Sequence, residues 1–87
     1  MSLQISKQNG IFYLDGRINS TTLKSFKTYF KYNLSQSKKI IINIDNVLEI
    51  DRSGVDAIYN FIKKAITKQK IFSVIGHGSK DIYDCIK

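Results

Sequence analysis

Two β-branched runs that alternate with amphipathic segments constrain the fold of this chain more than any other feature. The runs, residues 39–44 and 71–75, are rich in isoleucine, and β-branched side chains favour strands. Before each run lies a segment whose apolar side chains recur every three or four residues, as on one face of a helix. A strand, a helix and a further strand in this order imply parallel pairing with a right-handed crossover. The alternation therefore predicts an α/β protein.

A β-hairpin is predicted ahead of this unit. Residues 3–6 alternate apolar and polar side chains as a short strand does, and the Asn-Gly pair at 9–10 is a strong turn signal. Residues 11–14 follow as a second strand, which we expect to end at residues 15–16.

The first helix is predicted just after a stretch rich in capping residues, 19–22. It should be about 15 residues long and end near residues 35–37. We interpret its lysines as a solvated face. The apolar face would hold Leu23, Phe26, Phe30 and Leu34, and the basic face Lys24, Lys27 and Lys31.

The second half of the chain repeats the alternation. Residues 39–44 are predicted as a strand buried on both faces, followed by a turn at 45–46 and a segment, 47–50, that continues over the top of the sheet. A second helix follows residues 51–54. Its buried face would hold Val55, Ile58, Ile62, Ala65 and Ile66, with Lys63, Lys64 and Lys68 in solvent.

The remaining elements are a buried strand at 71–75, a loop at 76–79 and a last helix from 80 to 86. The complete prediction is one domain, residues 1–87, with a mixed, mainly parallel β-sheet, an N-terminal β-hairpin and helices packed on at least one sheet face. Ligand and partner surfaces in such folds gather beyond the carboxyl ends of the parallel strands. We therefore expect residues 15–16, 45–46, 51–54 and 76–78 to share one edge.

Composition excludes several classes of function. The net charge of +7, from 14 basic and 7 acidic residues, attracts phosphates, but only two of the basic residues are arginines, which base-reading proteins use most. We favour a solvated basic surface, with a small nucleic-acid-binding protein as a less favoured alternative.

The longest strictly apolar runs are three residues, so no membrane insertion is expected. The lone Cys85 excludes an internal disulfide and indicates a reducing cytoplasm.

Residues 50–55 carry the most specific chemical signal. Asp51, Arg52 and Ser53 place a carboxylate, a cation and a hydroxyl directly before a helix, where free backbone N–H groups and the positive dipole end meet. Asp51 or Ser53 could cap this helix, and a phosphate on Ser53 would lie near those donors. With one histidine and no G-x-S-x-G elbow, the sequence predicts no enzyme, no metal site and no cofactor.

Four segments, in order and at compatible spacings, make the chain resemble a STAS domain, the fold of bacterial anti-sigma factor antagonists. Residues 14–19 are similar to the family's "G-x-L-D" segment, and residues 50–55 to its "D-S-S-G-L" signature. The apolar strand reaching Asn43 and the strand-ending pair at 75–76 also match.

The resemblance implies a phosphorylation switch. The family's phosphorylated serine corresponds to Ser53, modified by a serine kinase that is also the anti-sigma factor and dephosphorylated by a PP2C-type phosphatase. The unmodified domain binds the anti-sigma factor. The partner-binding residues would be Asp51, Arg52, Gly54, Val55, Asp56, Asn19 and Ser20.

The chain also departs from the family pattern. Arg52 replaces the first serine of the signature and could pair with a phosphate, and Asn19 replaces an aspartate. The chain stops at Lys87, where the family pattern continues with another strand and helix, so we expect either a short family member or a truncated sequence. A missing final strand would leave the strand at 71–75 as an exposed edge open to a homodimer. The main alternative is a STAS adaptor subunit of an ABC-type membrane transport complex, which would use the same edge without phosphorylation.

Overall fold

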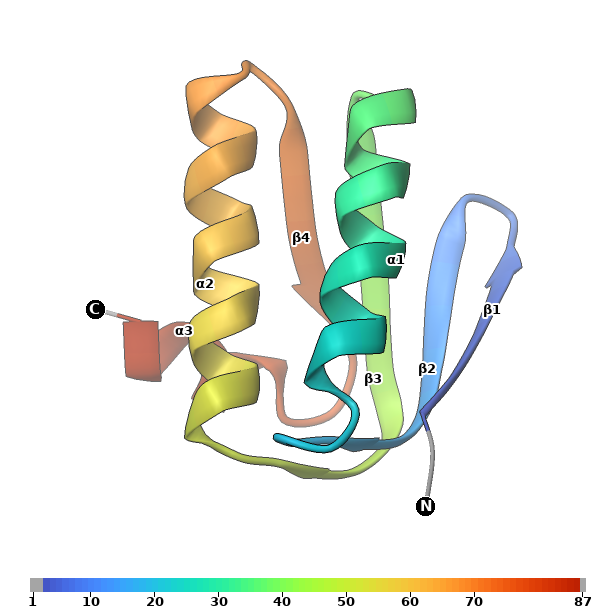
Figure 1. The fold of residues 1–87 in the computed structure, drawn as a ribbon, viewed down its shortest axis with the longest axis vertical. Helices are drawn as coiled ribbons and strands as arrows, with labels where there is room; N and C mark the ends of the chain where they lie inside the picture. The colour runs from blue at the N-terminus through green and yellow to red at the C-terminus, as the bar shows by residue number, and fades with distance from the viewer. Residues whose placement is uncertain (1–2, 87) are drawn as a thin grey trace.

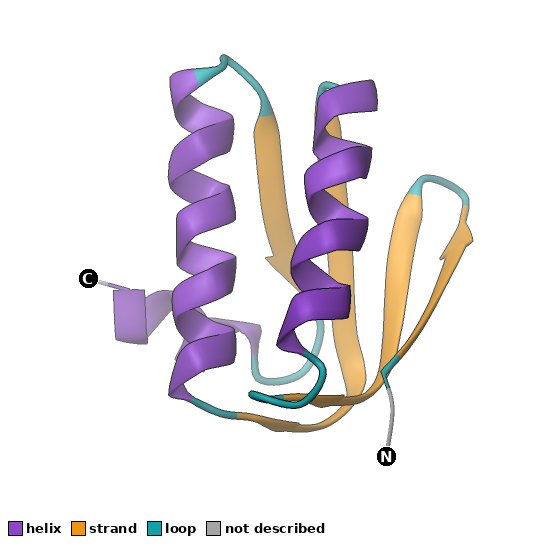
Figure 2. Cartoon of the chain, viewed as in Figure 1, coloured by secondary structure: helices purple, strands orange, loops and turns teal. Residues whose placement is uncertain are grey.

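A four-stranded sheet with two long helices on one face forms the body of the protein (Figures 1 and 2). The computed structural model describes residues 3–86, with side chains as far as Asp84, so the side chain of Cys85 lies outside the described part. The elements are β1 (Gln4–Gln8), β2 (Ile11–Ile18), α1 (Leu23–Gln36), β3 (Lys39–Ile50), α2 (Arg52–Thr67), β4 (Ile71–Ile75) and α3 (Ser79–Ile86).

The sheet topology confirms the predicted fold class. The strand order is β1-β2-β3-β4, with β1 antiparallel to β2 and the other two pairings parallel. The N-terminal hairpin turns at Asn9 and Gly10, both in the left-handed region. The first helix, α1, has 14 residues, close to the predicted length.

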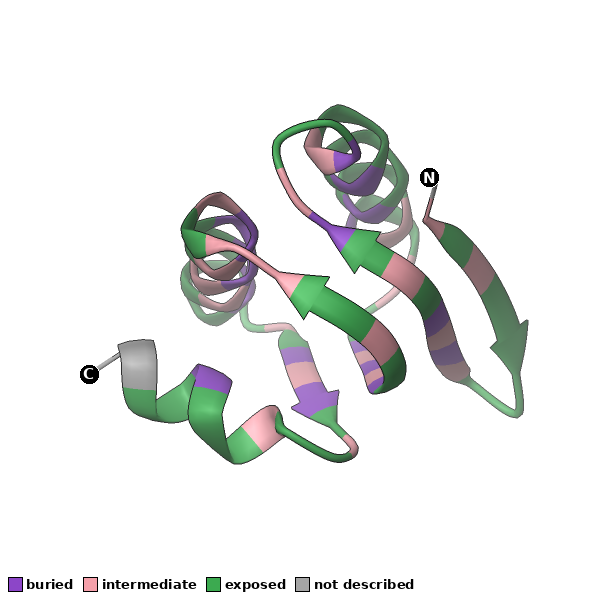
Figure 3. Ribbon diagram, turned by 90° about the horizontal axis from the view of Figure 1, so that it is seen from below, coloured by how far each residue is buried: buried purple, intermediate pink, exposed green. Residues whose placement is uncertain are grey.

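The core lies between the sheet and the two long helices, which Figure 3 shows on the same side of the sheet. Phe26, Phe30 and Leu34 of α1 are buried as predicted, whereas Leu23 is half-buried. Phe30 contacts Phe72 of β4 edge to face, with the ring centroids 5.9 Å apart. These aromatic contacts hold α1 against the far strand of the sheet.

Three burial predictions are wrong, for related reasons. In β3, Ile40 and Ile42 are buried but Ile41 is only half-buried, because the two long helices cover a single face of the sheet. In β4, Ile71 and Ile75 are exposed for the same reason. The buried face of α2 is rotated from the one predicted: Gly54, Ala57, Ile58, Phe61 and Ala65 are buried, Val55 and Ile62 are half-buried, and Ile66 is 69% exposed.

The boundaries of the central strands also differ from the prediction. The chain does not turn at Asp45 and Asn46, because β3 runs on to Ile50. Beside it, β2 passes Asp15 and continues to Ile18. The pairing of β2 with β3 shifts in register between Tyr13 and Asp15 and again between Gly16 and Arg17. Despite these shifts, the two strands stay paired as far as their last residues, Ile18 and Ile50.

The strand β4 forms one edge of the sheet, as the predicted homodimer requires. The backbone N–H of Val74 donates to the Tyr83 hydroxyl of α3 at 2.7 Å, so α3 already uses one donor of this edge. A dimer through β4 remains a prediction.

Candidate functional site

The start of α2 is fixed by the side chain of Asp51. This residue has extended backbone dihedrals, and its Oδ1 atom accepts a hydrogen bond from the N–H of Gly54 at 2.9 Å. A carboxylate in this position satisfies one of the free donors of the first helical turn. Of the two predicted capping residues, Asp51 is therefore the cap, and Arg52 and Ser53 belong to the first turn of the helix rather than to the loop before it.

The hydroxyl of Ser53 is held by the same carboxylate. Ser53 Oγ donates to Asp51 Oδ1 at 2.6 Å, and the side chain of Ser53 is half-buried. This bond, followed by the bond from the Gly54 N–H, lowers the pKa of the Asp51 carboxyl from its ordinary value. Ser53 is thus oriented at the N-terminal end of a helix with its oxygen beside a carboxylate.

The second oxygen of Asp51 connects the helix to a distant segment. Asp51 Oδ2 accepts the backbone N–H of Ser20, in the loop between β2 and α1, at 3.2 Å. The backbone N–H of Asp51 in turn donates to the carbonyl oxygen of Ile18 at 3.1 Å. One carboxylate therefore joins the start of α2 to the segment that leads into α1, and it brings Ser20 and Ser53 to the same site.

Gly54 allows this close approach. A Cβ atom at this position would lie 2.8 Å from Ile18 Cγ2, 2.9 Å from the Ile18 carbonyl oxygen and 2.9 Å from Ile50 Cγ1. The first turn of α2 can pack on the ends of β2 and β3 only because residue 54 has no side chain. The glycine of the signature is thus a packing requirement, and in this structure it is buried.

A second polar group beside the site joins the predicted Asn19 to Glu49, which the sequence did not single out. Glu49 Oε1 accepts from Asn19 Nδ2 at 3.2 Å and from Arg17 at 3.4 Å. Thr22 is buried; its hydroxyl donates to the Arg17 carbonyl oxygen at 2.8 Å and accepts the Asn19 N–H at 3.1 Å. Glu49 is the one charged residue in the apolar stretch 47–50, a signal that could have identified it.

Arg52 and Asp56 lie on the solvent side of α2. Arg52 Nε contacts Asp56 Oδ1 at 3.2 Å, and the Arg52 side chain is 85% exposed. In this unmodified form Asp56 is the partner of the guanidinium, and the pairing of Arg52 with a phosphate on Ser53 remains a prediction. Val55 is half-buried and turns toward a hollow on the other side of the helix.

The expected shared edge is divided into two groups. His77 N–H donates to Asp45 Oδ1 at 2.6 Å, while Asp51 contacts Ser20 and Ser53. Asp45 and Asp51 lie at opposite ends of the β3 extension, about 20 Å of extended chain apart. The predicted turn at 45–46 is a strand instead and separates the two groups, although His77 and Val55 line one hollow.

A hollow of about 300 Å³ lies between these two groups. Val55 of α2, Leu48 of β3 and His77 of the β4–α3 loop line it, and Leu48 is 75% exposed. Large exposed apolar side chains in a concave surface are typical of protein-binding sites. No cluster of three or more metal-ligating side chains occurs among the described residues.

These features and the fold identify the class of domain. The family model of the STAS domain matches residues 1–84, and the chain belongs to this family. No curated protein sequence matches the chain. Within residues 3–86, no helix combines the length and the apolar character that crossing a bilayer requires.

Solved structures show the same fold. The anti-sigma factor antagonist SpoIIAA in its unphosphorylated form has a TM-score of 0.71 and 11% identity, over 94% of this chain and 81% of SpoIIAA. An anti-sigma factor antagonist from Mycobacterium paratuberculosis has a TM-score of 0.68 and 14% identity, over 95% and 75% of the two chains. Mglu, at 0.63 and 14%, is matched over 82% of this chain and 18% of its own.

Proposed function

We propose that this STAS domain is a non-catalytic, cytoplasmic anti-sigma factor antagonist whose binding is switched by phosphorylation of Ser53. Its partners would be a serine kinase that is also the anti-sigma factor, and a PP2C-type phosphatase that reverses the modification. The observation that carries the proposal is the hydrogen bond from Ser53 Oγ to Asp51 Oδ1, at the start of α2. It presents one hydroxyl, in one orientation, next to the residues proposed to meet the partner.

A phosphate on Ser53 would change this site in two ways. It replaces the hydroxyl donor with a group of about −1.5 to −2 charges, attached to the Ser53 Oγ atom that lies 2.6 Å from Asp51 Oδ1. The donor that holds Asp51 is lost, and repulsion between the two anions follows. Because Asp51 also holds the Ser20 N–H, the loop before α1 loses its anchor together with the cap of α2.

The proposed interface is the surface around this carboxylate. Ser20 and Asn19 come from the loop before α1, and Val55 from the first turn of α2. A dianion inside a packed interface brings a desolvation cost and repulsion unless the partner supplies a matching cation. Arg52 offers limited compensation, since its guanidinium already contacts Asp56.

The first test is incubation of the protein with its cognate kinase and ATP, followed by mass spectrometry of the peptides. We expect one phosphate on Ser53 and none in a Ser53→Ala variant. Ser20, which shares the Asp51 carboxylate, is the internal comparison. Modification that spares Ser53 would overturn the switch.

The second test measures binding of the anti-sigma factor to wild type and to a Ser53→Asp variant. We expect the variant to bind at least about tenfold more weakly, because its carboxylate faces Asp51. Ser53→Ala, which introduces no charge, should retain most of the affinity. Full-strength binding by Ser53→Asp would favour the adaptor function in a membrane transport complex instead.

A further inference from the structure

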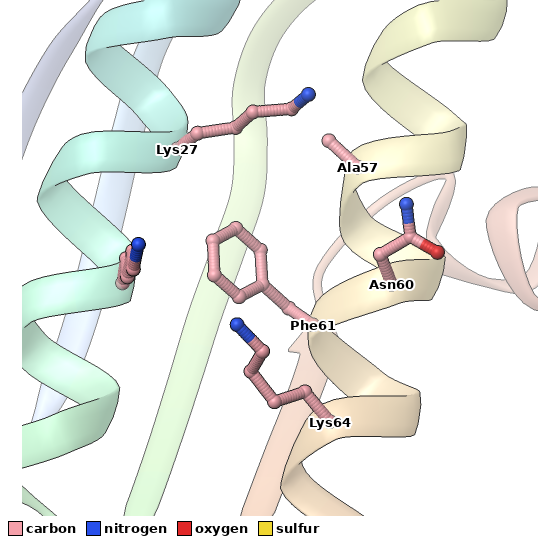
Figure 4. Close-up of a pocket in the computed structure, with 6 residues that line it drawn as sticks. Lys27, Ala57, Asn60, Phe61 and Lys64 are labelled. Carbon is pink, nitrogen blue, oxygen red and sulfur yellow. The ribbon is translucent and has the colours of Figure 1, made fainter.

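A groove between α1 and α2 combines an apolar floor with three lysines at its rim (Figure 4). In Figure 4 the side chains of Lys27 and Lys64 each extend toward the opposite helix at different levels of the groove, and the ring of Phe61 lies between these levels. The volume of the groove is about 160 Å³. Its lining consists of Lys27 and Lys31 on α1, and Ala57, Asn60, Phe61 and Lys64 on α2.

The positive charge of this groove is not compensated within the described residues. The ion pairs of Arg17 with Glu49 and of Arg52 with Asp56 involve no lysine of the groove. The helix α1 contains no acidic residue, and the one acidic residue of α2 is Asp56. Three lysines around one groove give it a positive charge that an anionic occupant would complement.

The floor of the groove is rigid and apolar. Phe61 is 7% exposed and stacks on Phe72 with ring centroids 5.3 Å apart. Its ring also contacts Phe26 and Phe30 of α1 at 5.9 and 6.5 Å. A volume of about 160 Å³ is below the range of drug-sized ligand pockets, about 300 to 1,000 Å³, and suits a single inserted side chain.

We propose that this groove binds an acidic amphipathic helix of a protein partner. Lys27 and Lys31 lie one helical turn apart, about 6 Å along the axis, which is the spacing of two carboxylates at positions i and i+4 of a second helix. Lys64 lines the groove from α2, extends toward α1 in Figure 4, and would pair with the opposite flank of the same helix. One apolar side chain of the partner would fill the space above Phe61, as in other helix-in-groove complexes.

The shape of the groove favours a protein helix over a membrane surface. Proteins that bind the bilayer surface insert apolar side chains that project from the molecule. Here the apolar floor is recessed between two helices. The large apolar side chains exposed in the described part of the chain all lie outside the groove, namely Tyr29, Tyr32, Leu48, Ile66, Ile71, Ile75 and Tyr83.

This surface is distinct from the proposed phosphorylation site. None of the residues that line the groove belongs to the hydrogen-bonded group around Asp51. Its occupancy can therefore be tested without the kinase, and failure of one proposal leaves the other intact.

The test uses a synthetic acidic peptide of about 18 residues, long enough to form a helix, with leucines on one face and flanking glutamates at i and i+4. Binding is followed by fluorescence anisotropy at about 50 mM salt and mapped by amide chemical shifts. We expect saturable binding with shifts at Lys27, Lys31, Ala57 and Lys64. A double variant, Lys27→Glu with Lys31→Glu, should lose at least about tenfold in affinity.

Two controls separate this site from general attraction to a basic protein. Lys63→Glu with Lys68→Glu changes the net charge equally, at one residue of α2 and at its C-cap, both outside the groove, and should keep binding within about threefold of wild type. A scrambled peptide of the same composition should bind at least about tenfold more weakly than the designed one. Equal losses in both double variants, or equal binding of both peptides, would overturn the proposal. So would binding to vesicles with anionic lipids, or to DNA, without binding to the designed peptide.

Discussion

Asp45 and Asp51, at the two ends of the β3 extension, do similar structural work with different partners. Each carboxylate accepts a backbone N–H from another segment: His77 for Asp45, and Ser20 for Asp51. Each also lies near a glycine that could not carry a Cβ without a clash, Gly76 and Gly54 respectively. Asp45 therefore joins the interior of β3 to the β4–α3 loop, and Asp51 joins the start of α2 to the loop before α1.

The difference is that Asp51 also accepts a side-chain hydroxyl. Ser53 Oγ shares Asp51 Oδ1 with the Gly54 N–H, whereas the bonds of Asp45 involve backbone N–H groups. A backbone N–H cannot be phosphorylated, but a hydroxyl can. The connection at Asp45 therefore offers no hydroxyl for phosphorylation, whereas the connection at Asp51 includes the Ser53 hydroxyl.

The largest expected effect is on the melting temperature, when alanine replaces either of the two glycines. Gly54→Ala should lower Tm by about 10 °C, because the new Cβ meets the Ile18 backbone and two buried contacts must shift. Gly76→Ala should lower Tm by about half as much. Its Cβ would meet the Asp45 carboxylate at 2.9 Å in an exposed loop that can move, although φ is +107°. Thermal denaturation followed by circular dichroism measures both, and equal losses would contradict the comparison.

The next effect concerns the carboxylates themselves. Asp51→Ala removes the cap of α2 and the anchor of Ser20, and should lower Tm by about 5 °C. Asp45→Ala exposes the His77 N–H to water and should lower Tm by about 2 °C. Asp51→Asn, which can still cap a helix, is the matched control and should retain most of the stability. A larger loss of Tm for Asp45→Ala than for Asp51→Ala would contradict the expectation that Asp51 contributes more to stability.

A smaller effect is a change in acid sensitivity. The Ser53 hydroxyl is the main cause of the lowered pKa of Asp51, so this carboxylate stabilises the fold above its unfolded pKa. That contribution is lost as the pH falls through the lower, folded value. In Ser53→Ala the pKa of Asp51 should rise toward 3.8, so the contribution of this carboxylate to stability becomes smaller and its loss on acidification is complete at a higher pH. NMR titration of the carboxyl carbon from about pH 6 to 2 measures this, and an unchanged pKa would show that the hydroxyl is not the cause.

The smallest effect is expected at Arg52. Its ion pair with Asp56 is exposed and spaced i, i+4, so Arg52→Ala should change Tm by less than about 2 °C. A protein phosphorylated on Ser53, as proposed, offers a sharper comparison. If Arg52 pairs with the phosphate, Arg52→Ala will lower Tm more in the phosphorylated protein than in the unmodified protein. A loss in the unmodified protein as large as that of Asp51→Ala would contradict this ranking.

The sequence predicted the order of the elements and the capped start of α2 because local signals determine both. Hydrophobic periodicity identified α1, and the carboxylate at Asp51 marked a helix start. The strand ends were mispredicted because the pair at 45–46 has the composition of a turn, and only pairing with β2 keeps it extended.

The site could be predicted only in part, for a similar reason. Residues next to each other in the sequence, such as Asp51 and Ser53, were identified together. The Ser20 contact and the Glu49 group join residues about 30 positions apart, and sequence pattern gives no direct signal for such pairs. Likewise, the lysines of α1 and α2 were read as two separate solvated faces, and only helix packing brings them to one groove.

The hydrogen bond from Val74 to Tyr83 has a consequence for solubility at high concentration. An unprotected edge strand is a template for intermolecular β-pairing and aggregation. With Ile71 and Ile75 exposed beside it, β4 would be a hazardous edge if its amides were free. The Tyr83 hydroxyl occupies the Val74 N–H, so unwinding of α3 would free this donor on an edge strand that already exposes Ile71 and Ile75. Other copies of the chain could then pair with β4.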